Sequence, residues 1–220
     1  MKKLVIVGAG EFAQIAFEYF THDSDYEVSA FTVESAYLRE SSLCGKPVVP
    51  YEALEHSHPA DSYEAFVAIP ATQLNSLRKR FYLDSRAKGY RLASYISSRA
   101  FVWRNATLGD NVFVFENNVI QPFVSLGNNC ILWSGNHVGH RTVIRDHVFI
   151  ASHAVISGYC EIGERCFIGV NSTFNDKVSV AERCVIGSGA LVVRDTEPGR
   201  IYVGSPARAV PGKASHEVRF

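Results

Sequence analysis

The sequence has no long apolar run, no excess of either charge and no basic stripe. None of its hydrophobic stretches reaches the roughly 20 residues that a membrane-spanning helix requires. Its 22 Lys and Arg residues balance its 22 Asp and Glu residues, so a strong attraction to phosphate backbones is missing. These absences argue against membrane and nucleic acid as partners, and we expect a soluble cytoplasmic protein.

Signs of secretion are also lacking. Two lysines precede an apolar run at the start, but the run is interrupted at Glu11 and no small-residue cleavage site follows. The five cysteines are an odd number without regular spacing. This pattern argues against a disulfide framework and fits a reducing compartment.

What the sequence does contain is a strict six-residue repeat. From Ile96 to Val192, every sixth residue is aliphatic or aromatic. A small or modest side chain usually stands two residues earlier, and residues two apart share one face of a strand. Glycines recur at the corners that follow. Each hexad is therefore predicted to be a short strand and a corner, and the hexads bury a core only by stacking as a β-solenoid.

Four of the five cysteines obey this register. Cys130, Cys160, Cys166 and Cys184 all occupy the small position before a periodic apolar residue. A buried free thiol packs as a small apolar group. We therefore interpret these four residues as core, and not as a zinc or redox site.

The residues before the repeat alternate between strand and helix patterns, which predicts a small parallel α/β sheet. Strands are expected at 3–7, 26–33 and 65–69, and helices at 11–20 and about 74–88. The predicted domains are an α/β domain at 1–93, a β-helix at 94–196 and a C-terminal coil-end and tail at 197–220.

A glycine turn joins the first predicted strand to the first helix. Backbone N–H groups at such a turn can approach a phosphate. Because GAGEFA lacks the third glycine of a dinucleotide fingerprint, we expect a nucleotide or sugar phosphate, or else a plain turn that needs glycine for its φ freedom. Glu34, at the end of the second strand, either binds a ribose or is solvated. The expected substrate contacts are Gly8, Ala9, Gly10, Glu11 and Phe12.

Five segments carry a family resemblance: VGAGEFAQIAFEYF, GNHVGHRTVIRDHVFIASHAVISG, CFIGVNSTF, VIGSGALVV and IYVGSPARAV. Together they resemble the bacterial sugar acyltransferase family of bacillosamine-pathway N-acetyltransferases and sialic acid O-acetyltransferases. The resemblance implies an N-terminal Rossmann-like α/β domain followed by an all-β left-handed parallel β-helix of hexapeptide repeats, with three hexads per turn. It also implies a homotrimer, acetyl-CoA bound between neighbouring helices as co-substrate, and a nucleotide-linked sugar held by the small domain.

With three hexads per turn, the corners stack into three edges. His140 lies on the first edge with His137 just before its corner, His147 lies on the second edge, and His153 lies on the third. The coenzyme contacts that the resemblance implies are Phe149, Gly158, Gly169, Val170, Gly187 and Ser188. All of these except Gly158 are expected on the third edge, with His153. In the family's trimer the first edge of one subunit faces the third edge of its neighbour, so the active sites are expected between subunits.

An amine or hydroxyl that attacks a thioester must lose a proton, and histidine can accept it near neutral pH. The resemblance assigns this role to His140. His153 and His137 are the second candidates, for binding the acetyl carbonyl or orienting His140, whereas His147 is expected at the surface. In the family an acidic residue follows the base; here Arg141 follows, so the orienting group must come from elsewhere or be absent.

Two further parts of the coenzyme site are expected. The thioester oxygen gains charge during the reaction and needs a donor, for which backbone N–H groups at residues 169–171 or 187–189 are suited. The segment Ile201–Arg208 resembles a coil-end that closes over the coenzyme. Arg208 either meets a CoA phosphate or is solvated.

These observations predict an acetyl-CoA-dependent acetyltransferase that acts on the amino group of a nucleotide-linked aminodeoxysugar in bacterial glycan biosynthesis. O-acetylation of a sugar hydroxyl stays open, because a histidine base serves both nucleophiles. A metal lyase like the γ-carbonic anhydrases, with zinc on His137, His140 and a neighbour's His153, is another alternative. The last alternative is a scaffold or sugar-binding module without catalytic activity. The favoured function requires no metal.

Overall fold

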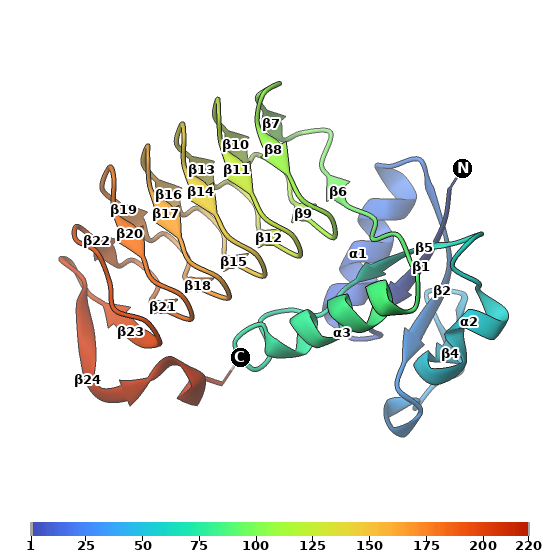
Figure 1. Ribbon diagram of the computed structural model, residues 1–220. Coiled ribbons are helices and arrows are strands. Elements are labelled where there is room, and N and C mark those ends of the chain that lie inside the picture. Colours follow the sequence, from blue (N-terminus) through green and yellow to red (C-terminus); the bar gives the residue numbers. More distant parts are fainter. Residues whose placement is uncertain (1, 220) are drawn as a thin grey trace. The chain divides into compact units, whose positions relative to one another are not determined.

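The computed structural model describes residues 2–219 (Figure 1). They divide into two compact units. An α/β unit contains the described residues through Pro70 together with Arg78–Tyr95, and a β-helix unit contains Ala71–Leu77 together with the residues from Ile96 onward. No helix among the described residues is long and apolar enough to cross a membrane.

The centre of the α/β unit is a five-stranded sheet in the order β3-β4-β2-β1-β5. The strands are β1 Lys2–Val7, β2 Tyr26–Val33, β3 Ser42–Leu43, β4 Lys46–Pro50 and β5 Glu64–Val67. All pairs are parallel except the β3–β4 hairpin. The last four residues of β1 are buried, as expected for a central parallel strand covered on both faces. The carboxyl ends of β1, β2 and β5 therefore meet at one edge, where ligands bind to such sheets.

Three helices accompany this sheet, and each buries part of its surface. They are α1 Glu11–His22, α2 Leu54–Ser57 and α3 Ser76–Ala87, with short 3-10 turns at Ser35–Tyr37, Tyr51–Ala53 and, in the tail of the other unit, Ser215–Glu217. Helix α1 buries Phe12, Ala13, Ala16 and Phe20, a spacing typical of an amphipathic helix. The fully buried Arg78 of α3 donates a 2.8 Å hydrogen bond to the carbonyl of Pro70.

Two-residue strands build the β-helix unit, and each ends on a periodic residue of the six-residue repeat. They are β6 Tyr95–Ile96, β7 Phe101–Val102, β8 Thr107–Leu108, β9 Phe113–Val114, β10 Val119–Ile120, β11 Ser125–Leu126, β12 Ile131–Leu132, β13 His137–Val138, β14 Val143–Ile144, β15 Phe149–Ile150, β16 Val155–Ile156, β17 Glu161–Ile162, β18 Phe167–Ile168, β19 Thr173–Phe174, β20 Ser179–Val180, β21 Val185–Ile186 and β22 Leu191–Val192.

From β7 to β19 each strand pairs in parallel with the strand three further along; Val138, for example, lies between Ile120 and Ile156. Three hexads thus make one coil, and the coils stack along the unit (Figure 1). This pattern fits a left-handed parallel β-helix preceded by an α/β part, which confirms that much of the predicted fold. We name the faces by their strands: face 1 holds β7, β10, β13, β16, β19 and β22, face 2 holds β8, β11, β14, β17 and β20, and face 3 holds β9, β12, β15, β18 and β21. The first edge joins face 1 to face 2, the second joins face 2 to face 3, and the third joins face 3 to face 1.

The four cysteines of the repeat are buried in this core, as predicted. Their thiols also act as hydrogen-bond donors to carbonyls at the corners. Sγ of Cys130, Cys160 and Cys166 donates to the carbonyls of Arg145, Asn175 and Ala181 at 3.2, 3.1 and 3.1 Å. Small side chains with a donor therefore suit this position because they fill space and satisfy buried backbone oxygens.

The sheet of face 3 is extended by two later strands, and a loop of the same unit packs on it. Strand β23 Arg200–Val203 pairs with β21, and β24 Arg208–Ala214 pairs with β23. Leu74 packs with Val185 and Ile201. The amide of Asn75 donates to the carbonyls of Arg165 and Cys166 at 3.2 and 3.0 Å, so the segment Ala71–Leu77 is fixed on this face.

Candidate active site on the edges of the β-helix

His140 and Gly158 face each other in adjacent coils of the first edge. They follow β13 and β16, which pair in register. A Cβ atom built on Gly158 would lie 2.6 Å from Cε1 of His140, so the imidazole lies directly against this glycine. The ring of Tyr159 contacts the imidazole edge-on, with the ring centroids 5.1 Å apart and the planes at 81°. His140 is thus an exposed histidine whose ring is packed in one orientation.

The backbone of His140 is held on both sides. Its N–H donates to Oε1 of Gln121 at 2.9 Å, and its carbonyl accepts the N–H of Tyr159 at 2.9 Å. Within residues 2–219, no hydrogen bond to either ring nitrogen is present. Both nitrogens of the imidazole are therefore open to an incoming substrate.

Arg141, the residue that replaces the family's acidic neighbour, is directed along the edge to the preceding coil. Its guanidinium carbon lies 4.5 Å from the centre of the Phe123 ring. Phe123 and Tyr159 are 53% and 51% exposed, so aromatic side chains are available on the coils before and after His140. The charge of Arg141 is thus engaged with an aromatic ring.

The third edge brings together most of the predicted coenzyme contacts. Gly169, Val170, Gly187 and Ser188 follow β18 and β21 at the corners of face 3 and share this edge with His153. The ring of Phe149 stacks on Phe167, with centroids 5.3 Å apart and planes at 9°. Gly158 is not part of this group, because it follows β16 and lies on the first edge beside His140.

His153 is also packed against a glycine. A Cβ atom on Gly135 would lie 2.6 Å from Cε1 and Nδ1 of His153. Gly135 has a φ of 76°, in the left-handed region that favours glycine. His137, by contrast, points outward from β13 on face 1, where its neighbours in the adjacent strands are Val119 and Val155.

The backbone N–H groups of the third edge fall into two classes. Those of Gly169 and Gly187 donate to the carbonyls of Ile186 and Tyr202, both at 2.8 Å. Those of Val170 and Ser188 have no acceptor within the described part of the chain. The structure thus narrows the predicted donors for a thioester oxygen to these two groups.

The prediction that His147 lies at the surface is wrong. His147 is only 4% exposed, and its Nδ1 lies 2.8 Å from Nδ2 of Asn129. Oδ1 of Asn129 in turn accepts a 2.8 Å hydrogen bond from Nδ2 of Asn111. All three have a positive φ at the second edge. The repeat of polar residues 18 positions apart was the signal for this stack.

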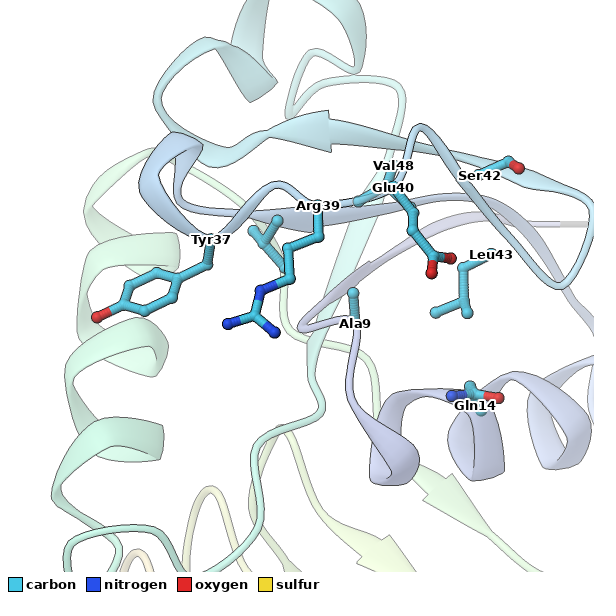
Figure 2. Close-up of a pocket in the computed structure, with 9 residues that line it drawn as sticks. Ala9, Gln14, Tyr37, Arg39, Glu40, Ser42, Leu43 and Val48 are labelled. Atoms are coloured by element: carbon cyan, nitrogen blue, oxygen red, sulfur yellow. The ribbon is translucent and has the colours of Figure 1, made fainter.

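In the α/β unit, a cavity of about 240 Å³ lies beside the glycine turn (Figure 2). Figure 2 shows the side chain of Arg39 extending toward Ala9 from the loop after β2. The cavity is lined by Ala9, Gln14, Val33, Tyr37, Arg39, Glu40, Ser42, Leu43 and Val48. Its lining combines apolar side chains with polar and charged ones, which can orient a small polar ligand.

The five predicted substrate contacts lie in different surroundings. Gly8 has a φ of 124°, and a Cβ atom there would lie 2.8 Å from the carbonyl oxygen of Ala68, so its glycine is required by the backbone alone. Gly10 precedes α1 with nothing within 4 Å of an added Cβ. Glu11 is exposed, whereas Phe12 is buried. Because its side chain is buried, Phe12 can contact a ligand only through its backbone.

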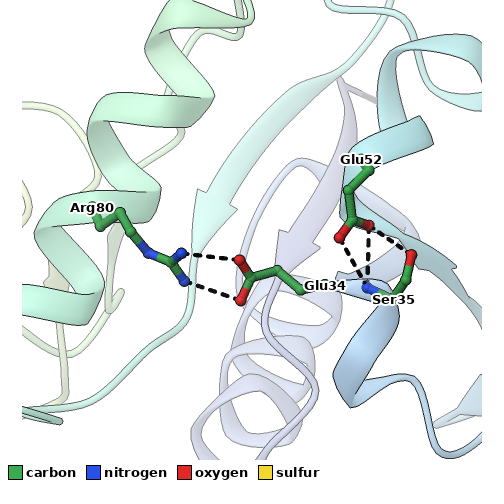
Figure 3. A network of polar contacts seen from close by, with 4 residues as sticks. All are labelled: Glu34, Ser35, Glu52 and Arg80. Carbon is green, nitrogen blue, oxygen red and sulfur yellow. Dashed lines mark hydrogen bonds and ion pairs between the residues drawn. The ribbon is translucent and has the colours of Figure 1, made fainter.

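Glu34 is part of a polar network at the end of β2 (Figure 3). Its two carboxylate oxygens accept hydrogen bonds of 2.9 and 3.0 Å from Arg80. Next to it, Glu52 accepts the N–H and the hydroxyl of Ser35. Hydrogen bonds from its own backbone and from Ser35 hold the pKa of Glu52 below its usual range. Glu34 is therefore ion-paired, and not a freely solvated glutamate.

Known proteins share this architecture. The family described as the GMPPB C-terminal domain matches residues 91–197. The acetyltransferase domain of PglB from Neisseria gonorrhoeae FA1090, in complex with acetyl coenzyme A, is 26% identical with a TM-score of 0.85, over 95% of this chain and 99% of that one. PerB from Caulobacter crescentus, in complex with CoA and GDP-perosamine, is 26% identical with a TM-score of 0.84, over 96% of this chain and 98% of that one.

A perosamine N-acetyltransferase from Caulobacter crescentus, with one histidine changed to asparagine and with CoA and GDP-perosamine bound, is 25% identical with a TM-score of 0.85, over 96% of this chain and 97% of that one. These structures confirm the resemblance that the sequence predicted: over nearly its whole length, the chain is similar to bacterial sugar N-acetyltransferases built from hexapeptide repeats.

Proposed function

We propose that this chain is an acetyl-CoA-dependent N-acetyltransferase that acts on the amino group of a nucleotide-linked aminodeoxysugar. The observation that carries the proposal is His140, an exposed histidine with both ring nitrogens open, on the edge of a β-helix. Its fold is similar to that of PglB with acetyl coenzyme A and PerB with CoA and GDP-perosamine. We also propose a cytoplasmic location, because the cysteines are free thiols and thiols stay reduced in the cytosol.

In the proposed reaction, the amine nitrogen of the sugar attacks the carbonyl carbon of the thioester. His140 accepts the proton that the nitrogen loses as the new C–N bond forms, and the proton then passes to the departing CoA sulfur. The N–H groups of Val170 and Ser188 donate hydrogen bonds to the carbonyl oxygen as its charge grows. His153, on the same edge, is the second candidate for that contact.

The outward side chains of the β-helix support the proposed trimer. On face 1 they are mainly apolar, and Phe101 and Val155 are 52% and 41% exposed. On face 2 they are mainly polar, as at Ser125 and Glu161, and on face 3 Val185 packs against Leu74 and Ile201 of its own unit. An exposed apolar face fits a subunit contact. We assign face 1 to the homotrimer interface, with each active site between the first edge of one subunit and the third edge of its neighbour.

The α/β unit is the proposed acceptor-binding part, with a Rossmann-like arrangement. The cavity beside Ala9 lies at the carboxyl ends of β1 and β2, and Arg39 provides a positive charge for the diphosphate of a nucleotide-linked sugar. The N-terminal turn of α1, which starts at Glu11, is the second element suited to a phosphate.

The test is release of free CoA by the purified full-length chain from acetyl-CoA and a panel of nucleotide-linked amino sugars. Each amino sugar is paired with its hydroxyl counterpart. We expect turnover on at least one amine and a loss of about 10²-fold or more in His140→Ala. Turnover restricted to hydroxyl sugars would show O-acetylation instead of N-acetylation. Full activity of His140→Ala would show that His140 is not the general base.

A further inference from the structure

The corner glycines of the β-helix differ in what requires them. A Cβ atom on Gly139, Gly163 or Gly169 would lie within 2.5–2.6 Å of backbone atoms of the next coil, so these glycines allow the coils to stack. For Gly158 the three nearest atoms all belong to the imidazole of His140, at 2.6, 2.9 and 3.0 Å. The space above Gly158 is thus reserved for the His140 ring.

Backbone conformation gives no other reason for glycine at this position. Gly158 is not among the residues with positive φ, so alanine is compatible with its backbone. Its N–H donates to Oδ1 of Asp176 at 2.9 Å, which fixes the peptide that carries it. The imidazole therefore packs against a peptide group that is held by a hydrogen bond.

Tyr159 closes the side of the same space. Its ring stands at 81° to the imidazole, an edge-to-face contact that favours one ring orientation. The N–H of Tyr159 donates to the carbonyl of His140, and Gln121 holds the N–H of His140. The histidine is thus fixed at its backbone and at its ring, although no hydrogen bond from the described residues holds the ring nitrogens.

We propose that Gly158 and Tyr159 form a slot that orients the imidazole of His140, and that both are positioning residues for the base. The role of His140 as base rests on the proposed function, whereas the slot itself rests on the packing of the ring. Packing then performs the task that a hydrogen-bonded partner performs in many histidine bases. The slot also leaves both ring nitrogens open.

The first test is Gly158→Ala. The three atoms nearest to the added methyl group all belong to the His140 ring, and none is a backbone atom. We expect kcat to fall by about 10²-fold, since a displaced base loses its alignment. Gly199→Ala is the matched control. Gly199 has a φ of 68° and open space around it, so the control loses stability but keeps kcat.

Tyr159 is tested by two variants. Tyr159→Phe keeps the ring and should retain kcat, whereas Tyr159→Ala opens the slot and should lower kcat about tenfold. Equal kcat in the two variants, at the wild-type value, would overturn the role of Tyr159.

The second readout is independent of turnover. In protein labelled with 13C at histidine Cε1, the His140 signal, assigned through His140→Gln, should shift in Gly158→Ala and stay in place in Gly199→Ala. An unchanged kcat or an unchanged His140 signal in Gly158→Ala overturns the proposal. If the wild-type chain acetylates no amine, the proposed function fails, and the signal alone still decides whether Gly158 orients the ring.

Discussion

The first and third edges of the β-helix both carry a histidine packed on a glycine, but they are built for different tasks. On the first edge the side chains of Gln121 and Asp176 bind the N–H groups of His140 and Gly158. On the third edge the corresponding N–H groups of Val170 and Ser188 have no acceptor in the described chain. One edge thus presents His140, the proposed base, and the other presents backbone donors.

The two glycines sharpen this contrast. Gly158 has an ordinary backbone conformation and makes room for the His140 ring, whereas Gly135 has a φ of 76° and also makes room for the His153 ring. The backbone conformation therefore requires glycine on one edge only. A single chain separates the base from the donors, so the proposed chemistry needs a second copy to unite them.

The largest expected effect comes from keeping the edges of two subunits apart. Val155→Lys places a charge at the middle of face 1 and should convert the trimer to monomers, because an apolar interface does not accommodate an unpaired charge. Activity should be lost with the trimer. Light scattering after size-exclusion chromatography, combined with CoA release, measures both.

Ser125→Lys on the polar face 2 is the control for this change and should remain trimeric and active. A Val155→Lys monomer that keeps wild-type turnover would contradict the shared active site.

The next effect separates the two histidines. His140→Ala should lower kcat by about 10²- to 10⁴-fold, because general-base catalysis is lost. His153→Ala should cost less, about tenfold, since backbone donors of the same edge remain. Steady-state CoA release at saturating substrates measures both, and an equal loss in the two variants would remove the proposed division of roles.

A smaller effect separates the two glycines. Gly135→Ala forces a non-glycine residue into the left-handed region and should lower the free energy of unfolding by about 1–2 kcal/mol. Gly158→Ala should leave that free energy nearly unchanged. Urea unfolding followed by circular dichroism compares the two, and equal destabilisation would show that both glycines are required by the backbone.

The smallest effect concerns Arg141. Because its guanidinium stacks on Phe123, Arg141→Ala should lower the free energy of unfolding by about 0.5–1 kcal/mol and leave kcat unchanged. The pH profile of kcat is the sensitive measurement. A shift of its acidic limb to higher pH in Arg141→Ala would show that this charge acts on His140 instead of on the aromatic ring.

Periodic features of the fold could be predicted from the sequence. A register of six places Val114, Val138 and Val192 on inward positions, where the structure buries them, but it is wrong at Ile96, which is 43% exposed at the start of the repeat. Stacking in threes places His140 and His153 on different edges. The four core cysteines follow from the same register. Such predictions succeed because each residue repeats the surroundings of the residue one coil away.

Features that depend on contacts between unlike segments could not be predicted. No pattern indicates that Leu74 packs on face 3 or that Arg80 binds Glu34. Gly158 shows the limit most clearly: the register places it two residues after a periodic residue, one residue later than the stacking glycines, but the sequence does not show that the His140 ring fills the space beside it. Side-chain direction at a corner depends on the coil beside it.

The most direct test of the central claim is a mixed trimer. His140→Ala lacks the base of the first edge, and the double variant Val170→Pro with Ser188→Pro lacks the free N–H groups of the third edge, so each alone should be inactive. After equal amounts are dissociated and reassembled together, about a quarter of the sites should combine two intact edges and restore about a quarter of wild-type CoA release. No recovery from a mixture shown to contain both subunits in one trimer would contradict an active site shared between neighbouring chains.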